Sequence, residues 1–262
     1  MKCGYVDIPE GQVHYRTAGS GEPVLLLHQT PFSSEEFAKV IPILARHYRV
    51  VAPDTMGYGN SDKPPRPFQL EDYVDTIAGL LDALGIEATN VVGHHTGAAL
   101  ASEMAVAYRE RVRRVVLSGC SLYDPQERVE FQNSPRFKPF EIDKEGAFLS
   151  ARWKSSWSLS PHMDLDMTYR LLVASLQAGP TLHDAHQAAF AFRKELKLPL
   201  IRCPVLVMAG SDDMFFPKMG PVSRLIPGSV TRVIQGAGNE PALEKPAEFA
   251  QAILEFFQST QA

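Results

Sequence analysis

The stretch Val91-Val92-Gly93-His94-His95-Thr96-Gly97 decides the fold. Its β-branched pair predicts the end of a buried strand, and the small-residue run 98–101 that follows predicts a helix. Glycines two residues on either side of His95 predict a tight strand-to-helix turn, which holds its central residue strained and exposed above a parallel sheet. Turns of this kind usually present a serine at the centre, whereas this one presents a histidine.

Apolar runs on either side of this stretch extend the pattern. Short strands are predicted at 24–27, 48–53, 112–118, 205–210 and 230–234, separated by helical segments. Strands that alternate with helices indicate a parallel sheet covered on both faces. The segment 121–198 departs from this alternation, with helices predicted at 144–158, 166–177 and 182–197. We therefore expect a core domain of residues 1–120 and 199–262, with residues 121–198 as a helical cap.

Composition narrows the class of protein. The chain has 262 residues, 45% of them hydrophobic, and a net charge of −4 with both signs interspersed. This balance gives no reason to expect a nucleic-acid or membrane partner. Three scattered cysteines without a CxxC pair, and no apolar leader or membrane-length run, predict a cytoplasmic protein. A small-molecule substrate and no cofactor are expected, and a homodimer stays open.

Five motifs occur in a characteristic order. They are Leu27-His28 with Pro31, Asp54 with the run 57–62, the turn 91–97, Gly210-Ser211-Asp212-Asp213, and Gly236-Ala237-Gly238-Asn239 leading into Glu244-Lys245-Pro246. In this order they resemble the α/β-hydrolase family over essentially the whole chain. The resemblance implies a mostly parallel sheet of about eight strands, with the ligand site at the carboxyl ends of the strands under the cap.

The resemblance also implies three catalytic positions: a nucleophile, an acid and a histidine base. These positions hold His95, Asp213 and Asn239, so only the acid matches and a serine acyl-enzyme mechanism is excluded. We hypothesise a chain in which Asp213 holds Asn239, and Asn239 holds the His95 ring. By the same resemblance, the backbone N–H groups of Thr30 and Thr96 form an oxyanion hole.

Other polar and aromatic residues are weaker candidates. Substrate contacts are expected from His28, Gln29, Trp153 and Trp157, although His28 can instead brace its loop. Arg152 and Tyr169 are further candidates for lining the site. The remaining histidines are expected to be ordinary buried or cap residues: His94 beside the turn, and His162, His183 and His186 in the cap.

Three functions remain open on the sequence. The leading hypothesis is an enzyme acting on a small carbonyl compound, with His95 as nucleophile or base, by ester, thioester or lactone hydrolysis or by lyase or C–C cleavage chemistry. The alternative is a catalytically silent binding protein that retains the pocket. A third is metal-assisted hydrolysis with ligands from His28, His95, Asp213 and Glu240, although their spacing fits no metal motif.

Overall fold

In the computed structural model, which describes residues 1–137, 141–159 and 164–259, eight strands form one sheet with the order β1-β2-β4-β3-β5-β6-β7-β8. Only the pairs β1–β2 and β2–β4 are antiparallel, and the other pairs are parallel. The strands are β1 Lys2–Ile8, β2 Gly11–Ala18, β3 Pro23–Leu27, β4 Arg49–Pro53, β5 Thr89–His94, β6 Val112–Ser118, β7 Val205–Gly210 and β8 Val230–Ile234.

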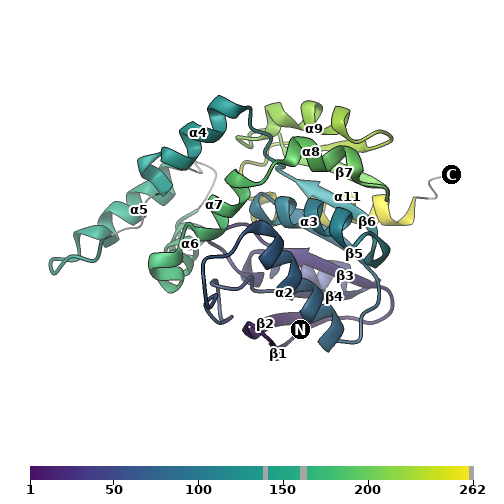
Figure 1. Cartoon of the computed structure of the whole chain (residues 1–262), viewed down its shortest axis with the longest axis horizontal. Helices are drawn as coiled ribbons and strands as arrows, with labels where there is room; N and C mark the ends of the chain where they lie inside the picture. Colours follow the sequence, from purple (N-terminus) through teal and green to yellow (C-terminus); the bar gives the residue numbers. More distant parts are fainter. Residues whose placement is uncertain (138–140, 160–163, 260–262) are drawn as a thin grey trace.

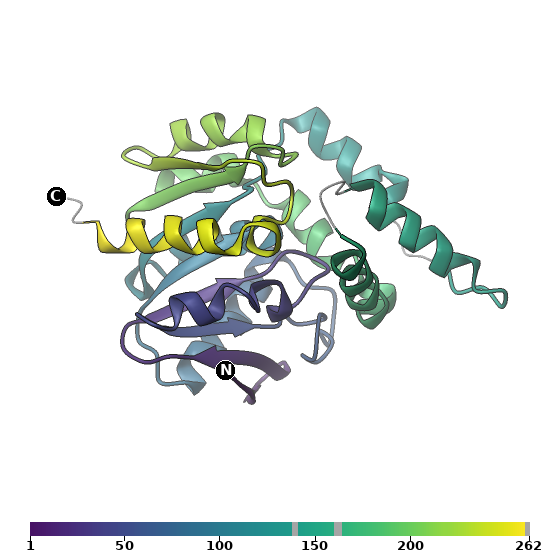
Figure 2. The same ribbon diagram turned by 180° about the vertical axis from the view of Figure 1, so that it is seen from behind.

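Helices cover both faces of this sheet (Figures 1 and 2). Alternate strand residues point to opposite faces, so Leu25 and Leu27 pack into one core and Val24 and Leu26 into the other. The first core includes α2 Leu70–Ala83, α3 Thr96–Ala107 and α9 Met219–Leu225, and the second includes α1 Ile41–Leu44 and α11 Pro246–Gln258. This is the expected α/β-hydrolase architecture. Within the described ranges, no helix has the length and apolarity needed to cross a membrane.

The register of the parallel strands brings the loops that follow them to one edge. Leu27 pairs with Gly93, Gly93 with Leu117, and Ser118 with Met208. The loops after β3, β5, β6 and β7 therefore start at nearly the same level. This is the edge of the sheet at which we expected the ligand site from the sequence.

A helical insertion between β6 and β7 lies over that edge and extends beyond the core (Figures 1 and 2). It contains α4 Pro125–Asn133, α5 Ala147–Leu159, α6 Leu165–Ala178 and α7 Asp184–Ala191. The cap was expected here, and its boundaries at residues 121 and 198 stay a prediction. Helix α4 was not expected, because its apolar residues follow no helical period. Its start is set instead by Asp124, whose side chain accepts from the backbone N–H groups of Gln126 and Glu127.

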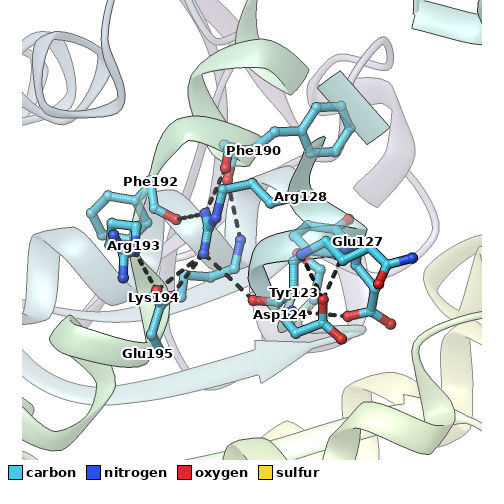
Figure 3. Close-up of polar contacts among 12 residues, drawn as sticks. Tyr123, Asp124, Glu127, Arg128, Phe190, Phe192, Arg193, Lys194 and Glu195 are labelled. Carbon is cyan, nitrogen blue, oxygen red and sulfur yellow. Dashed lines mark hydrogen bonds and ion pairs between the residues drawn. The ribbon is translucent and has the colours of Figure 1, made fainter. Parts of the chain in front are cut away.

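The helix predicted over 182–197 is interrupted in the structure. It ends as α7 at Ala191 and restarts as the short helix α8 Lys194–Lys197, because Phe192 is extended. Arg128 of α4 donates to the carbonyl oxygens of Phe190 at 2.6 Å and Phe192 at 2.9 Å (Figure 3). The side chain thus satisfies carbonyls that a continuous helix would bond internally. No local sequence pattern reveals this contact, which ties the two ends of the cap together.

Candidate active site

The turn between β5 and α3 is the tight elbow that its glycines predict. Its centre, His95, has φ 48° and ψ −106°, and no other non-glycine residue in the described ranges has a positive φ. A Cβ on Gly93 would lie 2.1 Å from the Gly97 carbonyl oxygen, and one on Gly97 would lie 2.0 Å from the Leu27 carbonyl oxygen. Both glycines are therefore required by close backbone packing. That packing holds His95 in a strained conformation at the edge of the sheet.

The His95 ring is held directly by Asp213. Its Nε2 atom lies 3.0 Å from Oδ2 of Asp213, whose side chain is fully buried in the loop after β7. The other carboxylate oxygen accepts from the backbone N–H of Phe215 at 2.7 Å. Burial alone would raise the pKa of Asp213, but the charge and hydrogen bond of His95 outweigh burial and lower it. Asp213 is therefore an ionised carboxylate paired with an imidazole.

This contact decides which ring nitrogen is reactive. An ionised carboxylate can only accept a hydrogen bond, so Nε2 of His95 carries the proton and donates it. In neutral imidazole, Nδ1 then keeps the free lone pair. No residue in the described ranges hydrogen-bonds to Nδ1, and His95 lines a cavity under the cap. Base or nucleophile chemistry at this elbow therefore belongs to Nδ1.

Neighbouring rings fix the His95 side chain further. His94 stacks on it with ring centroids 4.2 Å apart, and Phe215 meets it edge-on at 5.0 Å. His94 is fully buried, with Nδ1 3.0 Å from Oγ of Ser118 and Nε2 donating to the carbonyl oxygen of Asn239 at 2.8 Å. Burial lowers the pKa of His94 to about 3, so it stays neutral. This is the satisfied buried histidine that the sequence analysis expected.

Asn239 occupies a different place from the one hypothesised. The carboxylate of Asp213 contacts His95 itself, so the relay does not need Asn239 between them. The Asn239 side chain accepts from the backbone N–H of Met214 at 2.9 Å, which joins the loop after β8 to the loop after β7. The relay in the order Asp213, Asn239, His95 is therefore corrected to a direct His95–Asp213 pair. Asn239 still lines the cavity.

We expect Asn239→Ala to reduce kcat by no more than about tenfold, because the side chain of Asn239 accepts a neutral hydrogen bond from the Met214 backbone in the loop that carries Asp213. Steady-state kinetics on any hydrolysed ester measures this effect. A loss as large as that of an Asp213 variant would restore the relay and contradict the direct pair.

Gly119 offers a second way to test the pair. It follows β6 with φ 55°, and a Cβ there would lie 2.5 Å from Nε2 of His95 and 2.7 Å from Oδ2 of Asp213. We expect Gly119→Ala to lower kcat at least about tenfold, because displacing the ring costs more than one hydrogen bond. Gly85→Ala is the matched control, since its φ is 64° and nothing lies within 4 Å of its Cβ. It shares the backbone strain of about 1 kcal/mol and should leave activity unchanged. Equal activity in the two variants would contradict the geometry.

The loop after β3 is braced from two sides. His28 has Nδ1 2.8 Å from the Gln29 carbonyl oxygen, and its Nε2 accepts from the Thr55 backbone N–H at 2.9 Å. Burial lowers the pKa of His28. The fully buried Glu36 accepts from the Gln29 backbone N–H at 2.8 Å, and burial raises the pKa of its carboxyl well above the usual range. Both side chains thus fix the backbone that leads into Thr30.

The backbone N–H groups of Thr30 and Thr96 remain available to a ligand. Both residues line the cavity, and neither N–H donates to an acceptor within the described ranges. Thr96 is also the first residue of α3, where the helix dipole favours negative charge. The two donors belong to rigid backbone segments on either side of the elbow.

The cavity lies between the elbow and the cap and has a volume of about 1020 Å³ including its mouth. Gln29 lines it as predicted, whereas His28, Trp153 and Trp157 do not. His28 is turned into its loop by two backbone hydrogen bonds, and Trp157 is 45% exposed on the outside of α5. Tyr169, a weaker candidate, lines a separate hollow beside α6.

Several cavity residues were missed or undervalued in the sequence. Arg152 lines the cavity, as do His183 and His186, which were expected to be ordinary cap residues. Arg136, in the short 3₁₀ helix Pro135–Phe137, also lines the cavity. Arg152 was a candidate, but no sequence pattern identifies Arg136, His183 or His186, because their inward direction depends on how the cap helices pack. His162 lies outside the described residues.

The four hypothetical metal ligands do not form a common site, although His95 and Asp213 are in contact. Within the described ranges, no group of three His, Cys, Asp or Glu side chains is arranged to hold a metal ion. His28 uses both ring nitrogens in its loop. Cys120 is buried, and burial raises the pKa of its thiol to about 11, which keeps it protonated.

The fold, the elbow and the buried acid after β7 together define a class of protein. A family model described as the alpha/beta hydrolase fold matches residues 22–246, so the chain belongs to the alpha/beta hydrolase family. The class of enzyme that this membership indicates is a hydrolase.

The individual proteins that the chain resembles share between a quarter and two fifths of their aligned residues with it. An uncharacterised protein of Mycobacterium tuberculosis is 27% identical over 275 residues, which cover 94% of this chain and 78% of that protein. The 2-hydroxy-6-oxo-2,4-heptadienoate hydrolase of Pseudomonas putida is 37% identical over 112 residues, covering 41% of each protein. A thermophilic esterase from Thermogutta terrifontis, solved with malate bound, has a TM-score of 0.78 and 25% identity, covering 98% of each chain.

Proposed function

We propose that the protein is a cofactor-independent hydrolase of small carbonyl compounds in which His95 is the general base. In this proposal Nδ1 of His95 activates a water molecule, and Asp213 orients the ring and stabilises its charged form. The backbone N–H groups of Thr30 and Thr96 stabilise the oxyanion. Residues 1–120 and 199–262 provide this machinery, and the cap of residues 121–198 closes the cavity over it.

The observation that carries the proposal is the 3.0 Å contact between Nε2 of His95 and Oδ2 of Asp213. In a serine hydrolase, an acid orients a histidine that serves as the base for a serine. Here the histidine comes from the elbow itself, so the acid–base pair remains while the serine is lost. A paired base without a hydroxyl nucleophile is suited to activating water. A silent relic would have no reason to retain a buried carboxylate aligned with an imidazole in the cavity.

In this mechanism the substrate forms no covalent bond to the protein. The oxygen of water attacks the carbonyl carbon while its proton moves to Nδ1 of His95. The negative charge that develops on the carbonyl oxygen is stabilised by the two backbone N–H groups. The tetrahedral intermediate then collapses, the bond to the leaving group breaks, and His95 returns the proton to the leaving alkoxide or thiolate. The products are the acid and the alcohol or thiol.

Attack by Nδ1 itself is disfavoured because this nitrogen is next to the ring carbon that bears Cβ and lies close to the backbone. An acyl group there would crowd the elbow.

The test is pre-steady-state kinetics with activated small esters and thioesters, combined with intact-protein mass measurement. We expect no burst of leaving group and no acyl adduct on the protein. A burst matched by an adduct on His95 would replace the general-base mechanism with a nucleophilic one.

Proton abstraction beside a carbonyl is a second candidate, because the same lone pair and the same N–H donors suit an enolate. Lyase or C–C cleavage chemistry would follow from it. Incubation of β-keto acids and ketones in deuterium oxide distinguishes the two candidates. Deuterium incorporation that depends on His95, without ester turnover, would favour the lyase reading. Absence of both reactions across the panel would favour the alternative of a silent binding protein.

A further inference from the structure

A second hollow lies next to the catalytic cavity, on the other side of α6. Leu171 and Ser175 of this helix line the cavity, whereas Tyr169 and Val173 line the hollow. Residues two apart in a helix point in nearly opposite directions, so α6 forms a wall between the two spaces. The hollow measures about 870 Å³ including its mouth, and it opens to solvent, because Tyr169 is 59% and Val173 43% exposed.

Phe32 completes this wall beside α6. Among the residues that the structure describes, it alone lines both the cavity and the hollow. It is almost fully buried, with 3% of its surface exposed. The two spaces therefore approach each other to within the size of one phenylalanine residue. At this point a side chain, and not the backbone of a helix, keeps them apart.

Apolar contacts hold Phe32 in place. It packs with Met167 and Leu171 of α6 and with Leu243 from the segment after β8. Ala174, which lines the hollow, packs against the same cluster. The ring thus fills the gap between the loop after β3 and α6. Because its neighbours are apolar, this gap would suit a hydrocarbon chain if the ring were absent.

The place of Phe32 in the chain relates it to the bound carbonyl of the proposed reaction. Phe32 lies two residues after Thr30, so the Cα atoms of the two residues are at most about 7 Å apart. The backbone N–H of Thr30 is one of the two donors to the carbonyl oxygen. A chain that leaves the bound carbonyl along this loop therefore reaches the Phe32 ring after a few carbon atoms.

We propose that Phe32 closes the catalytic cavity against the hollow beside α6 and so limits the length of an unbranched chain attached to the substrate carbonyl. This proposal rests on the proposed function for the position of the carbonyl. It narrows the substrate class to carbonyl compounds whose chain on this side is short. Without the ring, the hollow becomes a continuation of the cavity, and a longer chain runs along Ala174 and Val173 toward solvent.

Ligands that resist hydrolysis measure this limit without turnover. Straight-chain primary amides from butanamide to octanamide are titrated by calorimetry into the wild type and Phe32→Ala, and into both proteins with His95→Ala added. Each methylene that becomes buried should tighten binding about fourfold. We expect this gain to stop partway along the series in the wild type and to continue for at least two more carbons in Phe32→Ala. Octanamide should then bind the variant at least about tenfold more tightly than the wild type, with butanamide within a factor of about two.

Met167→Ala is the matched control. Met167 belongs to the same cluster and is 5% exposed, but it lines neither the cavity nor the hollow. The variant loses similar apolar packing and should keep the wild-type limit. Phe32→Leu retains part of the packing if Phe32→Ala does not fold, and it should shift the limit in the same direction by less. Adding Ala174→Phe to Phe32→Ala places a ring on the hollow side of the gap, so the wild-type limit should return.

The inference is wrong if the wild type and Phe32→Ala share one chain-length limit, if Met167→Ala shifts the limit equally, or if no amide binds either protein. These results are distinct from a failure of the proposed function. A shifted limit in the His95→Ala background supports closure by Phe32 even where no ester is hydrolysed. An unshifted limit overturns it even where ester hydrolysis depends on His95.

Discussion

His95→Ala should abolish most of the hydrolytic activity, with kcat/KM falling by about 100- to 10,000-fold, the usual contribution of a positioned general base. The residual rate comes from the backbone N–H groups of Thr30 and Thr96, which the substitution leaves in place. The measurement is kcat/KM on the best ester from the panel, with the unfolding midpoint recorded in parallel. A stable variant with low activity assigns the loss to chemistry.

Two further variants sharpen this result. His47→Ala removes an exposed histidine far along the chain from the elbow and should keep full activity. His95→Ser returns a hydroxyl to the elbow, but Asn239 cannot accept its proton, so we expect it to be as inactive as His95→Ala. Wild-type turnover in either His95 variant would show that the His95 ring takes no part in catalysis.

Asp213→Asn should be nearly as damaging, with kcat lower by about 10,000-fold if the pair behaves as the corresponding pair does in serine proteases. The reason lies in the second hydrogen bond of Asp213. In the wild type, the Phe215 backbone N–H donates to Oδ1 of Asp213 at 2.7 Å. In the variant, the same N–H keeps the amide oxygen of the new side chain at this position. The new NH₂ group then faces Nε2 of His95, which must accept and so loses its proton to Nδ1. The reactive lone pair is thereby removed.

The control for this variant is Asp212→Asn, which changes the neighbouring carboxylate without touching the pair and should retain activity. Steady-state kinetics and thermal unfolding of both proteins give the comparison. If Asp213→Asn keeps more than about a tenth of the wild-type kcat, a loss smaller than the 1.4 kcal/mol of one hydrogen bond, orientation of the ring by Asp213 is not part of the mechanism.

The fold was predictable because its signals are local and steric. The elbow follows from Gly93 and Gly97, because a Cβ at either position would overlap a backbone carbonyl oxygen in the structure. The buried strands read as short apolar runs, since both faces of the parallel sheet are covered. The cap was less predictable: its helices are held by contacts such as that of Arg128 with Phe192, which join residues 64 positions apart.

The positions of the candidate residues could be predicted from the sequence, but the contacts between them could not. His95, Asp213 and Asn239 lie at one edge of the sheet, because they follow the carboxyl ends of the parallel strands β5, β7 and β8. The sequence placed Asn239 between the other two because that position usually supplies the base. An imidazole on the elbow reaches Asp213 by itself, which leaves Asn239 to hold the Met214 backbone. The direction of Arg136 and His183 into the cavity depends on cap packing, so no pattern in the sequence could reveal it.

In the proposed mechanism, Asp213 holds the His95 ring with its proton on Nε2 and its lone pair on Nδ1. Nitrogen-15 NMR of histidine-labelled protein tests it directly and needs no substrate, with the His95 signals assigned by their disappearance in His95→Ala. We predict a protonated Nε2 and an unprotonated Nδ1 in the neutral ring of the wild type, and the opposite tautomer in Asp213→Asn. A proton on Nδ1 in the wild type, or the same tautomer in both proteins, would contradict it.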